Sequence, residues 1–315
     1  MKWDSSSQAA AQAFVQKAAE NSSVYKESSQ KQYGQMMKEK RKSLETRGDA
    51  ILTEAWGNGE AFRNYLSVLC RFSMVQPGNT LGEGVTNAAL IYGQMPFAKC
   101  LKTFDQWTAM GEHIKKGSAG IDILVPNVVE RNGQPVTYYN PAKVFDVSQT
   151  TYHLKSNPLY EVDDLDVIRS VSNSRLFDIL VREDLPDGLE AAYIPKINEL
   201  WVQDGLNARE TRAALFRETA HFYFSQTSEY ERTPQRNFEA YASAYLVSAY
   251  FELDTGEDLM PLPKEAFPAT VKTGAEIRES VSSALNTSKM MSETMELTLE
   301  KLGAQLYTQN EEVSR

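Results

Sequence analysis

Residues 192–221 read AYIPKINELWVQDGLNARETRAALFRETAH. The alternation of apolar residues predicts short strands at Ala191–Ile194 and Leu200–Val202, joined by a turn at residues 195–198. Apolar residues then return at helical spacing, so we expect a helix from Ala208 to about Ser225. A further strand is expected before this stretch, at 177–181, and two further helices after it, at 235–252 and 274–307. Short strands followed by a run of helices indicate an α+β fold.

Two residues inside the predicted helix have the spacing that is found in a catalytic metal site. Glu218 and His221 stand as the second and last residues of an HExxH motif. In that motif two histidines one helical turn apart bind zinc, and the glutamate removes a proton from metal-bound water. Here the first histidine is replaced by Arg217, which stays protonated and has no lone pair to donate. On these residues alone the signal is weak, since such a spacing is more often a surface pair or a core histidine than a metal site.

The first half of the chain is expected to begin with helices and to continue with strands. Residues 1–48 are polar and predict a helix with frayed ends, and apolar spacing predicts two more helices at 61–72 and 86–94. Asn132-Gly133 is a strong hairpin turn signal. The strands expected around this turn are Ile121–Val125, Val136–Tyr139 and Lys143–Val147.

Lysines and aromatic residues are interleaved between residues 94 and 120, where acidic residues are few. Unpaired bases stack on aromatic rings while lysines neutralise phosphates, so this mixture suits a single-stranded nucleic acid. The aromatic residues also fit the buried side of a helix, and the lysines fit a solvated turn, so both interpretations stay open. The residues concerned are Lys99, Lys102, Lys115 and Lys116, with Phe97, Phe104 and Trp107.

The charge of the chain is distributed unevenly between its two halves. The 315 residues carry a net charge of −9, which alone would argue against a nucleic-acid partner. Residues 1–150, however, hold 17 Lys and Arg against 14 Asp and Glu, a balance of +3, and residues 151–315 have a balance of −12. The first half therefore suits a polyanion, and the acidic second half suits a basic protein partner that the sequence does not identify.

The composition is that of a globular protein, with 42% hydrophobic and 24% charged residues. The longest apolar stretch, 241–251, is too short to span a bilayer, and the N-terminal residues form no apolar export signal. Cys70 and Cys100 are too few for a disulfide framework, which fits a reducing compartment. We expect a cytoplasmic protein without a membrane partner.

Separated blocks in the first half carry a family resemblance. They are NAALIYGQMP at 87–96, FDQW at 104–107, HIKKG at 113–117 with GIDIL at 120–124, and VFDVSQT at 144–150. In order and spacing they resemble the N-terminal domain of ArdC-type antirestriction proteins and their LtrC-like relatives. That domain binds single-stranded DNA and travels on conjugative plasmids and transposons. The resemblance implies contacts to the DNA backbone from Lys99, Lys102, Lys115 and Lys116. It does not say which aromatic ring stacks on a base. We expect Phe104 and Trp107 to do so, but Trp107 also fits a core position, so Phe97 and Tyr92 stay open alternatives.

The second half is similar to the C-terminal peptidase domain of the same family. The stretch quoted first and the segment FEAYASAY at 238–245 carry this similarity. It implies that Glu218 takes the general-base position and that His221 and Glu239 take two metal-ligand positions. The resemblance thus implies an α+β protein with an N-terminal α/β single-strand-binding domain and a C-terminal zincin-like domain. The expected divisions are a polar helical extension at 1–48, the DNA-binding domain at 49–155, a linker at 156–175, the zincin-like domain at 176–260 and a C-terminal helical segment at 261–315.

The missing histidine leaves two protein ligands where a catalytic zinc needs three. We therefore expect no resident metal, and we expect the guanidinium of Arg217 to lie near Glu218 or Glu239 and to neutralise it in the metal's place. The function predicted is that of a single-stranded DNA-binding protein of a mobile element, related to antirestriction or conjugation, with an inactive peptidase-like domain. The alternative is an active zinc metallopeptidase with an altered ligand set, and zinc content distinguishes the two.

Overall fold

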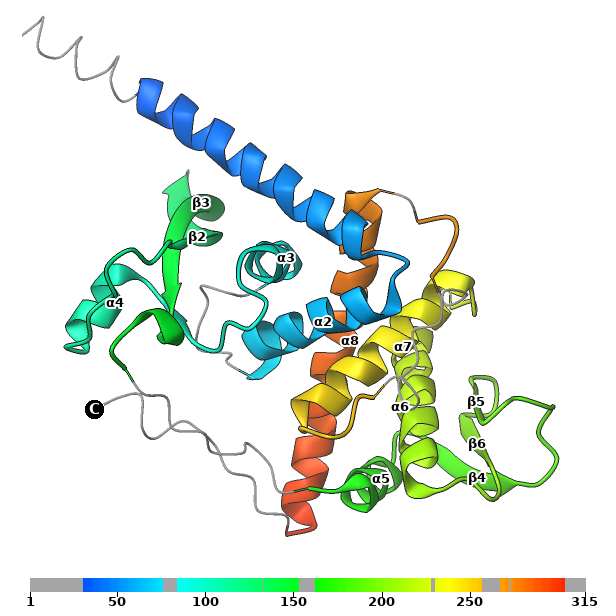
Figure 1. Ribbon diagram of the computed structural model, residues 1–315. Coiled ribbons are helices and arrows are strands. Elements are labelled where there is room, and N and C mark those ends of the chain that lie inside the picture. Colours follow the sequence, from blue (N-terminus) through cyan, green and yellow to red (C-terminus); the bar gives the residue numbers. More distant parts are fainter. Residues whose placement is uncertain are drawn as a thin grey trace, which may run out of the picture.

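The protein has an α+β fold in which helices form the centre and a small sheet lies on each side (Figure 1). The computed structural model describes residues 31–75, 84–131, 133–152, 162–227, 230–256, 267–271 and 273–303. The predicted fold class is confirmed. Residues 1–30 of the predicted polar extension lie outside the described residues, as do the last residues of the predicted C-terminal helix.

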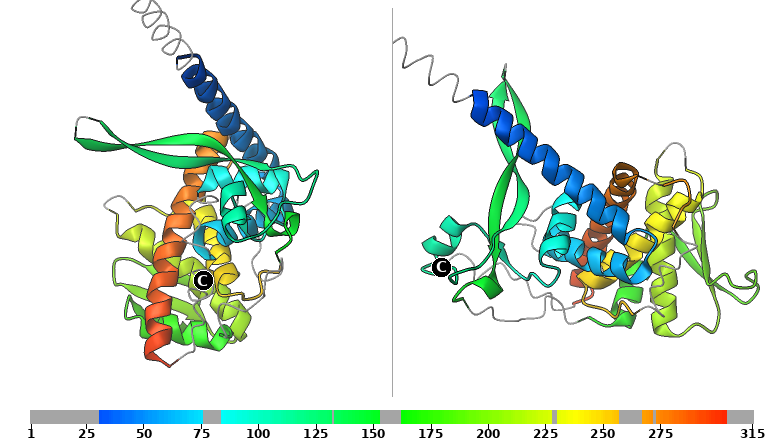
Figure 2. Two further views of the ribbon diagram at one scale, coloured as in Figure 1. Left: turned by 90° about the vertical axis from the view of Figure 1, so that its left-hand side faces the viewer. Right: turned by 45° about the horizontal axis from the view of Figure 1, so that its top comes forward.

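The first sheet is built around a long hairpin. Its strands β2 (Ile121–Arg131) and β3 (Gln134–Asp146) pair antiparallel along their whole length, and β1 (Leu101–Lys102) pairs with the other side of β3. Side chains near Ile121 are buried, whereas most of those near the turn are exposed, and the hairpin extends beyond the helical body (Figure 2). The predicted hairpin is confirmed, but the two strands expected after its turn, 136–139 and 143–147, form the single strand β3. The strands of the hairpin are longer than the alternation suggested, because backbone pairing continues past the buried residues.

Helices from both halves of the chain pack against one another at the centre. Helix α2 contacts α7, α3 contacts α8, and one contiguous apolar core runs from Leu52 to Leu299. The predicted helices are confirmed within three residues at each end, except that the last one ends at Lys301, about six residues before the predicted end. They are α2 (Gly59–Cys70), continued by the π-helical turn η1 (Arg71–Val75), α3 (Val85–Gln94), α6 (Ala208–Ser225), α7 (Pro234–Tyr250) and α8 (Gly274–Lys301).

The N-terminal helix, drawn in blue in Figure 1, does not end at residue 48 but continues to residue 55. Gly48 is buried where this helix crosses α3, and a Cβ atom placed there would lie 2.9 Å from Cγ2 of Thr86. Glycine usually weakens a helix, but here it lets two helices approach closely. The helical residues beyond it, including Leu52 and Ala55, join the core.

The predicted linker at 156–175 is wrong for residues 164–173, which form helix α5 (Asp164–Asn173). Helix α5 buries Val167 and Val171 and packs against α6 and α8. The acidic residues that suggested a polar linker have a local role, because the Asp163 side chain accepts hydrogen bonds from the backbone of Leu165 and Asp166. Carboxylates are favoured at such a position because a helix N-terminus carries unpaired N–H groups and a partial positive charge. The other predicted divisions of the chain remain predictions.

The second sheet has the order β4-β6-β5. Strand β4 runs parallel to β6, and β5 runs antiparallel to it, so the strands predicted in this region are confirmed. Helix α6 follows β6 after an Asn207 cap with a reciprocal Glu210 contact and packs against β5 and β6. None of the described helices combines the length and the apolar character needed to cross a bilayer. The strands are β4 (Asp178–Arg182), β5 (Ala191–Ile194) and β6 (Glu199–Gln203).

Candidate functional site

The three residues predicted at catalytic and metal-ligand positions are all buried on the packed helices α6 and α7. Glu218 is 5% exposed, His221 3% and Glu239 1%. Glu218 and His221 are three residues apart on α6 and therefore share one face of that helix. Helix α7, which carries Glu239, begins with a Thr233 cap and a proline at its first position.

The carboxylate of Glu218 has two firm partners on one oxygen. Its Oε2 accepts a hydrogen bond of 2.7 Å from the backbone N–H of Tyr193 in β5 and forms an ion pair with Arg232. Burial raises the pKa of Glu218, and the opposing attraction of Arg232 and the hydrogen bond from Tyr193 favour the charged form. The residue in the general-base position is therefore held by the protein's own donors.

Glu239 is held just as closely. Its Oε2 forms an ion pair with Arg236 and accepts a hydrogen bond of 2.9 Å from Ser283 Oγ in α8, and its Oε1 accepts one of 3.2 Å from Gln235 Nε2. The guanidinium of Arg236 also lies 4.9 Å from the ring centroid of Phe224. A buried carboxylate with this many donors is well compensated for the loss of water.

His221 is surrounded by an apolar and positively charged environment. Its Nδ1 is 3.0 Å from the hydroxyl oxygen of Tyr230. Burial lowers the pKa of His221 to about 3, and the charges of Arg232, Arg217 and Arg236 act in the same direction. The imidazole is therefore neutral at physiological pH, and the arginines that depress its pKa include those paired with Glu218 and Glu239.

Arg217 does not pair with Glu218 or Glu239, so this part of the sequence prediction is wrong. Its guanidinium forms an ion pair with Glu190, just before β5, and lies 5.1 Å from the ring centroid of Tyr241. Arg217 is still close enough for its positive charge to favour the charged form of Glu218 and to lower the pKa of His221, one helical turn further on. The ion pairs with the two carboxylates come from Arg232 and Arg236, which the sequence analysis did not predict.

Sequence reasoning did not find Arg232 and Arg236. The signal that was available is the segment ERTPQR at 231–236, in which two arginines flank the cap and proline that start a helix. Arg236 then precedes Glu239 by three residues, a spacing that brings side chains together on a helix. The position of Arg232 next to Glu218 depends on the turn between α6 and α7 and has no comparable local signal.

The donor set at this place does not fit a divalent metal. Within the described ranges, no three His, Cys, Asp or Glu side chains converge in a way that could hold an ion. The two predicted ligands, His221 and Glu239, already bind Tyr230 and Arg236. Three guanidinium groups act on His221, and their charges would oppose a dication. No chemical step through a metal can be assigned to these residues.

The predicted DNA-binding residues lie around β1 and the short helix α4 (Phe104–Ala109). Phe97 is 85% exposed and Phe104 55%, whereas Tyr92 packs against the core and is only partly buried. Trp107 is fully buried, and its indole Nε1 donates a hydrogen bond of 2.9 Å to the Phe145 carbonyl of β3. The expectation that Trp107 stacks on a base is therefore wrong, because its ring anchors α4 on the sheet.

The predicted lysine contacts lie at the surface of the same region. Lys99, Lys115 and Lys116 are exposed, and Lys102 is half-buried with its Nζ 5.9 Å from the ring centroid of Trp107. The ammonium of Lys115 donates a hydrogen bond of 2.9 Å to the Ser148 carbonyl. That contact orders the lysine while its side chain remains exposed.

The block VFDVSQT holds the lysine-bearing loops in place, a role the sequence did not reveal. Asp146 is 1% exposed, and its Oδ1 accepts hydrogen bonds of 2.6 and 2.9 Å from the backbone N–H groups of Lys99 and Cys100. Gln149 donates to the Ala119 carbonyl at 2.7 Å, and its own carbonyl accepts from the backbone of Lys115 at 2.8 Å. Asp146 and Gln149 thus connect both loops to the end of β3.

These features define the class of the protein, an α+β chain whose two small sheets flank a shared helical core. The same fold occurs in the antirestriction protein ArdC from plasmid R388, whose Mn(II)-bound crystal structure superposes with a TM-score of 0.50 at 16% identity, over 67% of this chain and 83% of that one. The metal-free form of ArdC gives a TM-score of 0.49 at 16% identity, over 67% and 85%. The predicted resemblance to the ArdC type is confirmed at the level of the fold.

Sequence comparison also finds a similarity to a longer protein. The uncharacterized protein pXO2-81 of Bacillus anthracis is 21% identical over 307 residues, which cover 80% of this chain. The alignment covers 50% of that relative, so this chain spans about half of its length. No model of a known protein family matches the chain.

Proposed function

We propose that this chain is an ArdC-like single-stranded DNA-binding protein of a mobile element, acting in antirestriction or conjugation, and that its peptidase-like site is not catalytic. The fold shared with a plasmid antirestriction protein supports the first part. Fold alone does not define an activity, so the argument rests on the two sites.

The observation that carries the proposal is the pair of exposed phenylalanines among lysines. Phe97 and Phe104 keep 85% and 55% of their surface in solvent, within eight residues that also contain Lys99 and Lys102. Stacking of a base on an aromatic ring contributes about 1–3 kcal/mol, and it needs a ring that is accessible. The lysines supply the charge that phosphates require. Single strands fit this surface better than a duplex, whose bases are already stacked.

The peptidase-like site supports a non-catalytic role through its arginines. A hydrolytic glutamate needs a free lone pair close to a water molecule. The Oε2 atom of Glu218 is engaged by Tyr193 and Arg232, which leaves fewer lone pairs for a water molecule, and Glu239 is paired with Arg236. We infer that the two ion pairs perform the structural role that a metal performs in the peptidase fold, which is to balance buried charge where α6 and α7 meet.

DNA binding is tested by fluorescence anisotropy of a labelled oligo-dT strand with the full chain, which is used because α2 and α3 pack on α7 and α8. Replacement of both Phe97 and Phe104 by Ala should weaken binding by at least tenfold, since each stacked base contributes about 1–3 kcal/mol. The matched control is Lys196→Ala, an exposed lysine in the acidic half, which should leave affinity unchanged. Equal affinity for duplex DNA, or full affinity of the double variant, would refute the DNA-binding proposal.

The ion pairs are tested separately by metal content. The purified chain, dialysed against Zn²⁺ or Mn²⁺ and then against metal-free buffer, should retain well under one ion per molecule. Stoichiometric metal that a chelator removes, together with loss of thermal stability on removal, would contradict the non-catalytic interpretation and favour a metallopeptidase. That outcome would leave the DNA-binding proposal standing.

A further inference from the structure

Strand β4 forms an edge of the second sheet with hydrogen-bonding groups directed outward. The backbone N–H of Asp178 donates to the Asn198 carbonyl at 3.2 Å, and the Arg182 carbonyl accepts from Asp204 at 2.7 Å. In a parallel ladder alternate residues face the partner strand, so Asp178, Leu180 and Arg182 face β6. The N–H and C=O groups of Ile179 and Val181 therefore point away from the sheet, where no other described strand pairs with β4.

The side chains of this edge are unusually apolar for a position in solvent. Leu180 is 40% exposed and Val181 66%. Natural proteins usually protect an edge with charges, a proline or a bulge that discourages pairing with another chain. Ile179 and Val181, whose backbone groups point away from the sheet, are both β-branched, which favours the extended conformation of β4 itself.

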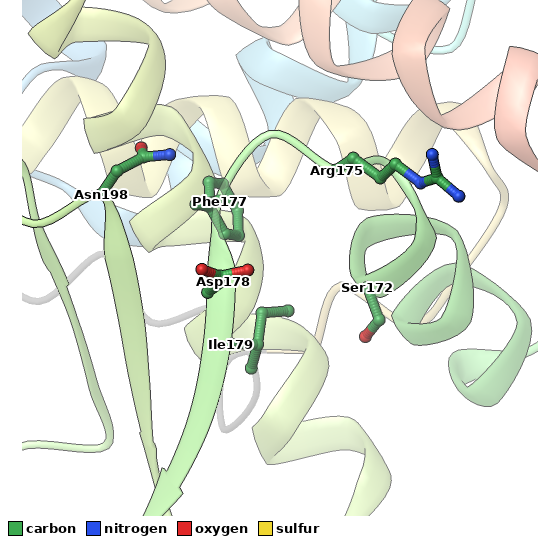
Figure 3. A pocket seen from close by; sticks show the side chains of 6 residues that line it. All are labelled: Ser172, Arg175, Phe177, Asp178, Ile179 and Asn198. Carbon is green, nitrogen blue, oxygen red and sulfur yellow. The ribbon is translucent and has the colours of Figure 1, made fainter.

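A pocket of about 630 Å³ lies next to this edge, between β4 and the end of α5 (Figure 3). Ile179 of β4 and Ser172 of α5 face each other across it. A strand added to β4 would direct alternate side chains to the same face of the sheet as Ile179, and so toward this pocket. Recognition by strand addition combines backbone hydrogen bonds, which supply affinity, with pockets for alternate side chains, which supply selectivity.

The charge around the edge determines which kind of strand fits. Residues 175–204 contain seven acidic and three basic residues. Arg182 is paired with Asp184, and Figure 3 shows Arg175 directed away from Asp178. Exposed carboxylates for which the structure shows no ion pair remain on both sides of β4, in the described part of the chain, at Asp178, Glu183, Asp187 and Asp204. A positively charged partner is attracted to this surface, and DNA is repelled by it.

We propose that β4 binds an extended, basic segment of a partner protein, which adds to the sheet as a further strand. Its backbone pairs with Ile179 and Val181, an apolar side chain enters the pocket beside Ser172, and Lys or Arg side chains contact the surrounding carboxylates. This surface is independent of the DNA-binding proposal. The edge of β4 would be the binding site, within the acidic half of the chain, for the basic protein partner that the negative charge of this half suits.

The test uses the full chain and a labelled peptide of alternating lysine and valine residues, measured by fluorescence anisotropy. The first variant is Val181→Pro, which removes an outward N–H without touching the ladder to β6. The second is Val181→Lys, which keeps the backbone and adds a repelling cation at an exposed position. Each should weaken binding at least tenfold, whereas Val181→Thr, the matched control, should bind as the unchanged chain does. Circular dichroism and the melting temperature establish that each variant is folded.

The charge argument has its own controls. An alternating glutamate and valine peptide should not bind, and raising the salt concentration should weaken binding of the lysine peptide. Equal binding of both peptides, or undiminished binding to Val181→Pro and Val181→Lys, would overturn the proposal. So would a concentration-dependent dimer of the chain that the Val181→Pro substitution abolishes, because the edge would then belong to a second copy.

Discussion

The two partners of the Arg236 and Glu239 ion pair should differ strongly in what their removal does to stability. The side chain of Glu239 is 2% exposed, whereas that of Arg236 is 37% exposed. If Arg236 is replaced by Met, the carboxylate stays buried and retains only the hydrogen bonds from Ser283 and Gln235. If Glu239 is replaced by Gln, the guanidinium of Arg236 can reorient toward the solvent and be hydrated.

The expected magnitudes follow from this difference in burial. Leaving a buried charge without its partner lowers the free energy of unfolding by about 3–5 kcal/mol. Replacing Glu239 by an amide of the same shape removes one charge-assisted hydrogen bond and costs about 1–2 kcal/mol. The Met side chain preserves much of the packing on Phe224, where the Arg236 guanidinium lies 4.9 Å from the ring centroid. Arg236→Met should therefore be less stable than Glu239→Gln by about 2–3 kcal/mol.

Urea unfolding followed by circular dichroism measures these differences. With a dependence on urea of about 3 kcal/mol per M, 2 kcal/mol corresponds to a midpoint shift of about 0.7 M. The double variant, with Met and Gln together, should be more stable than Arg236→Met alone, because the stranded charge is gone. Two results would refute the view that Arg236 compensates a buried carboxylate. One is an equal loss of unfolding free energy in the two single variants, and the other is a double variant that is less stable than Arg236→Met.

Three further predictions concern the same two sites. The pKa of His221 is about 3 in the folded chain against 6.5 in the unfolded one, so the unfolded chain binds the extra proton between these values, and the stability that is complete above pH 6.5 is lost as the pH falls toward 3. His221→Gln should therefore reduce the pH dependence of the unfolding free energy by up to about 1.4 kcal/mol per pH unit in this window. An unchanged dependence on pH would contradict the burial of a neutral imidazole. Arg217→His should not create a zinc site, as measured by metal content after dialysis, because Arg232 and Arg236 still hold the carboxylates; one ion per chain in this variant would show that the arginine alone had excluded the metal. Asp146→Ala should lower the unfolding free energy by about 2–3 kcal/mol and weaken oligonucleotide binding, because it releases the backbone of Lys99. If this variant binds the oligonucleotide with unchanged affinity, the loop that Asp146 anchors does not take part in DNA binding.

Periodicity and turn signals were sufficient to place most of the secondary structure. The range predicted for α6, Ala208 to about Ser225, agrees with the observed helix, since its cap, its helix-forming residues and its apolar spacing all agree. The hairpin at residue 133 is equally local, because two residues at the turn and an apolar alternation define it. Helix α5 was missed because its cap and first turn are acidic, and an acidic polar segment was read as a linker.

The candidate sites were harder to predict, because burial and partner choice depend on distant residues. Trp107 and Phe104 are both aromatic residues next to lysines, yet one anchors α4 on β3 and the other is exposed. The partners that bury Trp107, which include the Phe145 carbonyl and Tyr152, lie more than 35 residues away in the sequence. The sequence identified Arg217 at the position of the first histidine, but it did not identify the partner of Arg217, since Glu190 is 27 residues away in the sequence.

Residue chemistry established in advance that this chain lacks one metal-binding histidine, that its charge is divided between its halves, and that its strands and helices follow an ArdC-like order. Those properties belong to single residues or to short segments, where spacing and side-chain type are sufficient. The packing of α6 against α7 decided that Arg232 pairs with Glu218 and Arg236 with Glu239, and the position of β4 at a sheet edge decided which backbone groups remain open. Electrostatic compensation and strand pairing act across space, between residues that the order of the chain does not bring together.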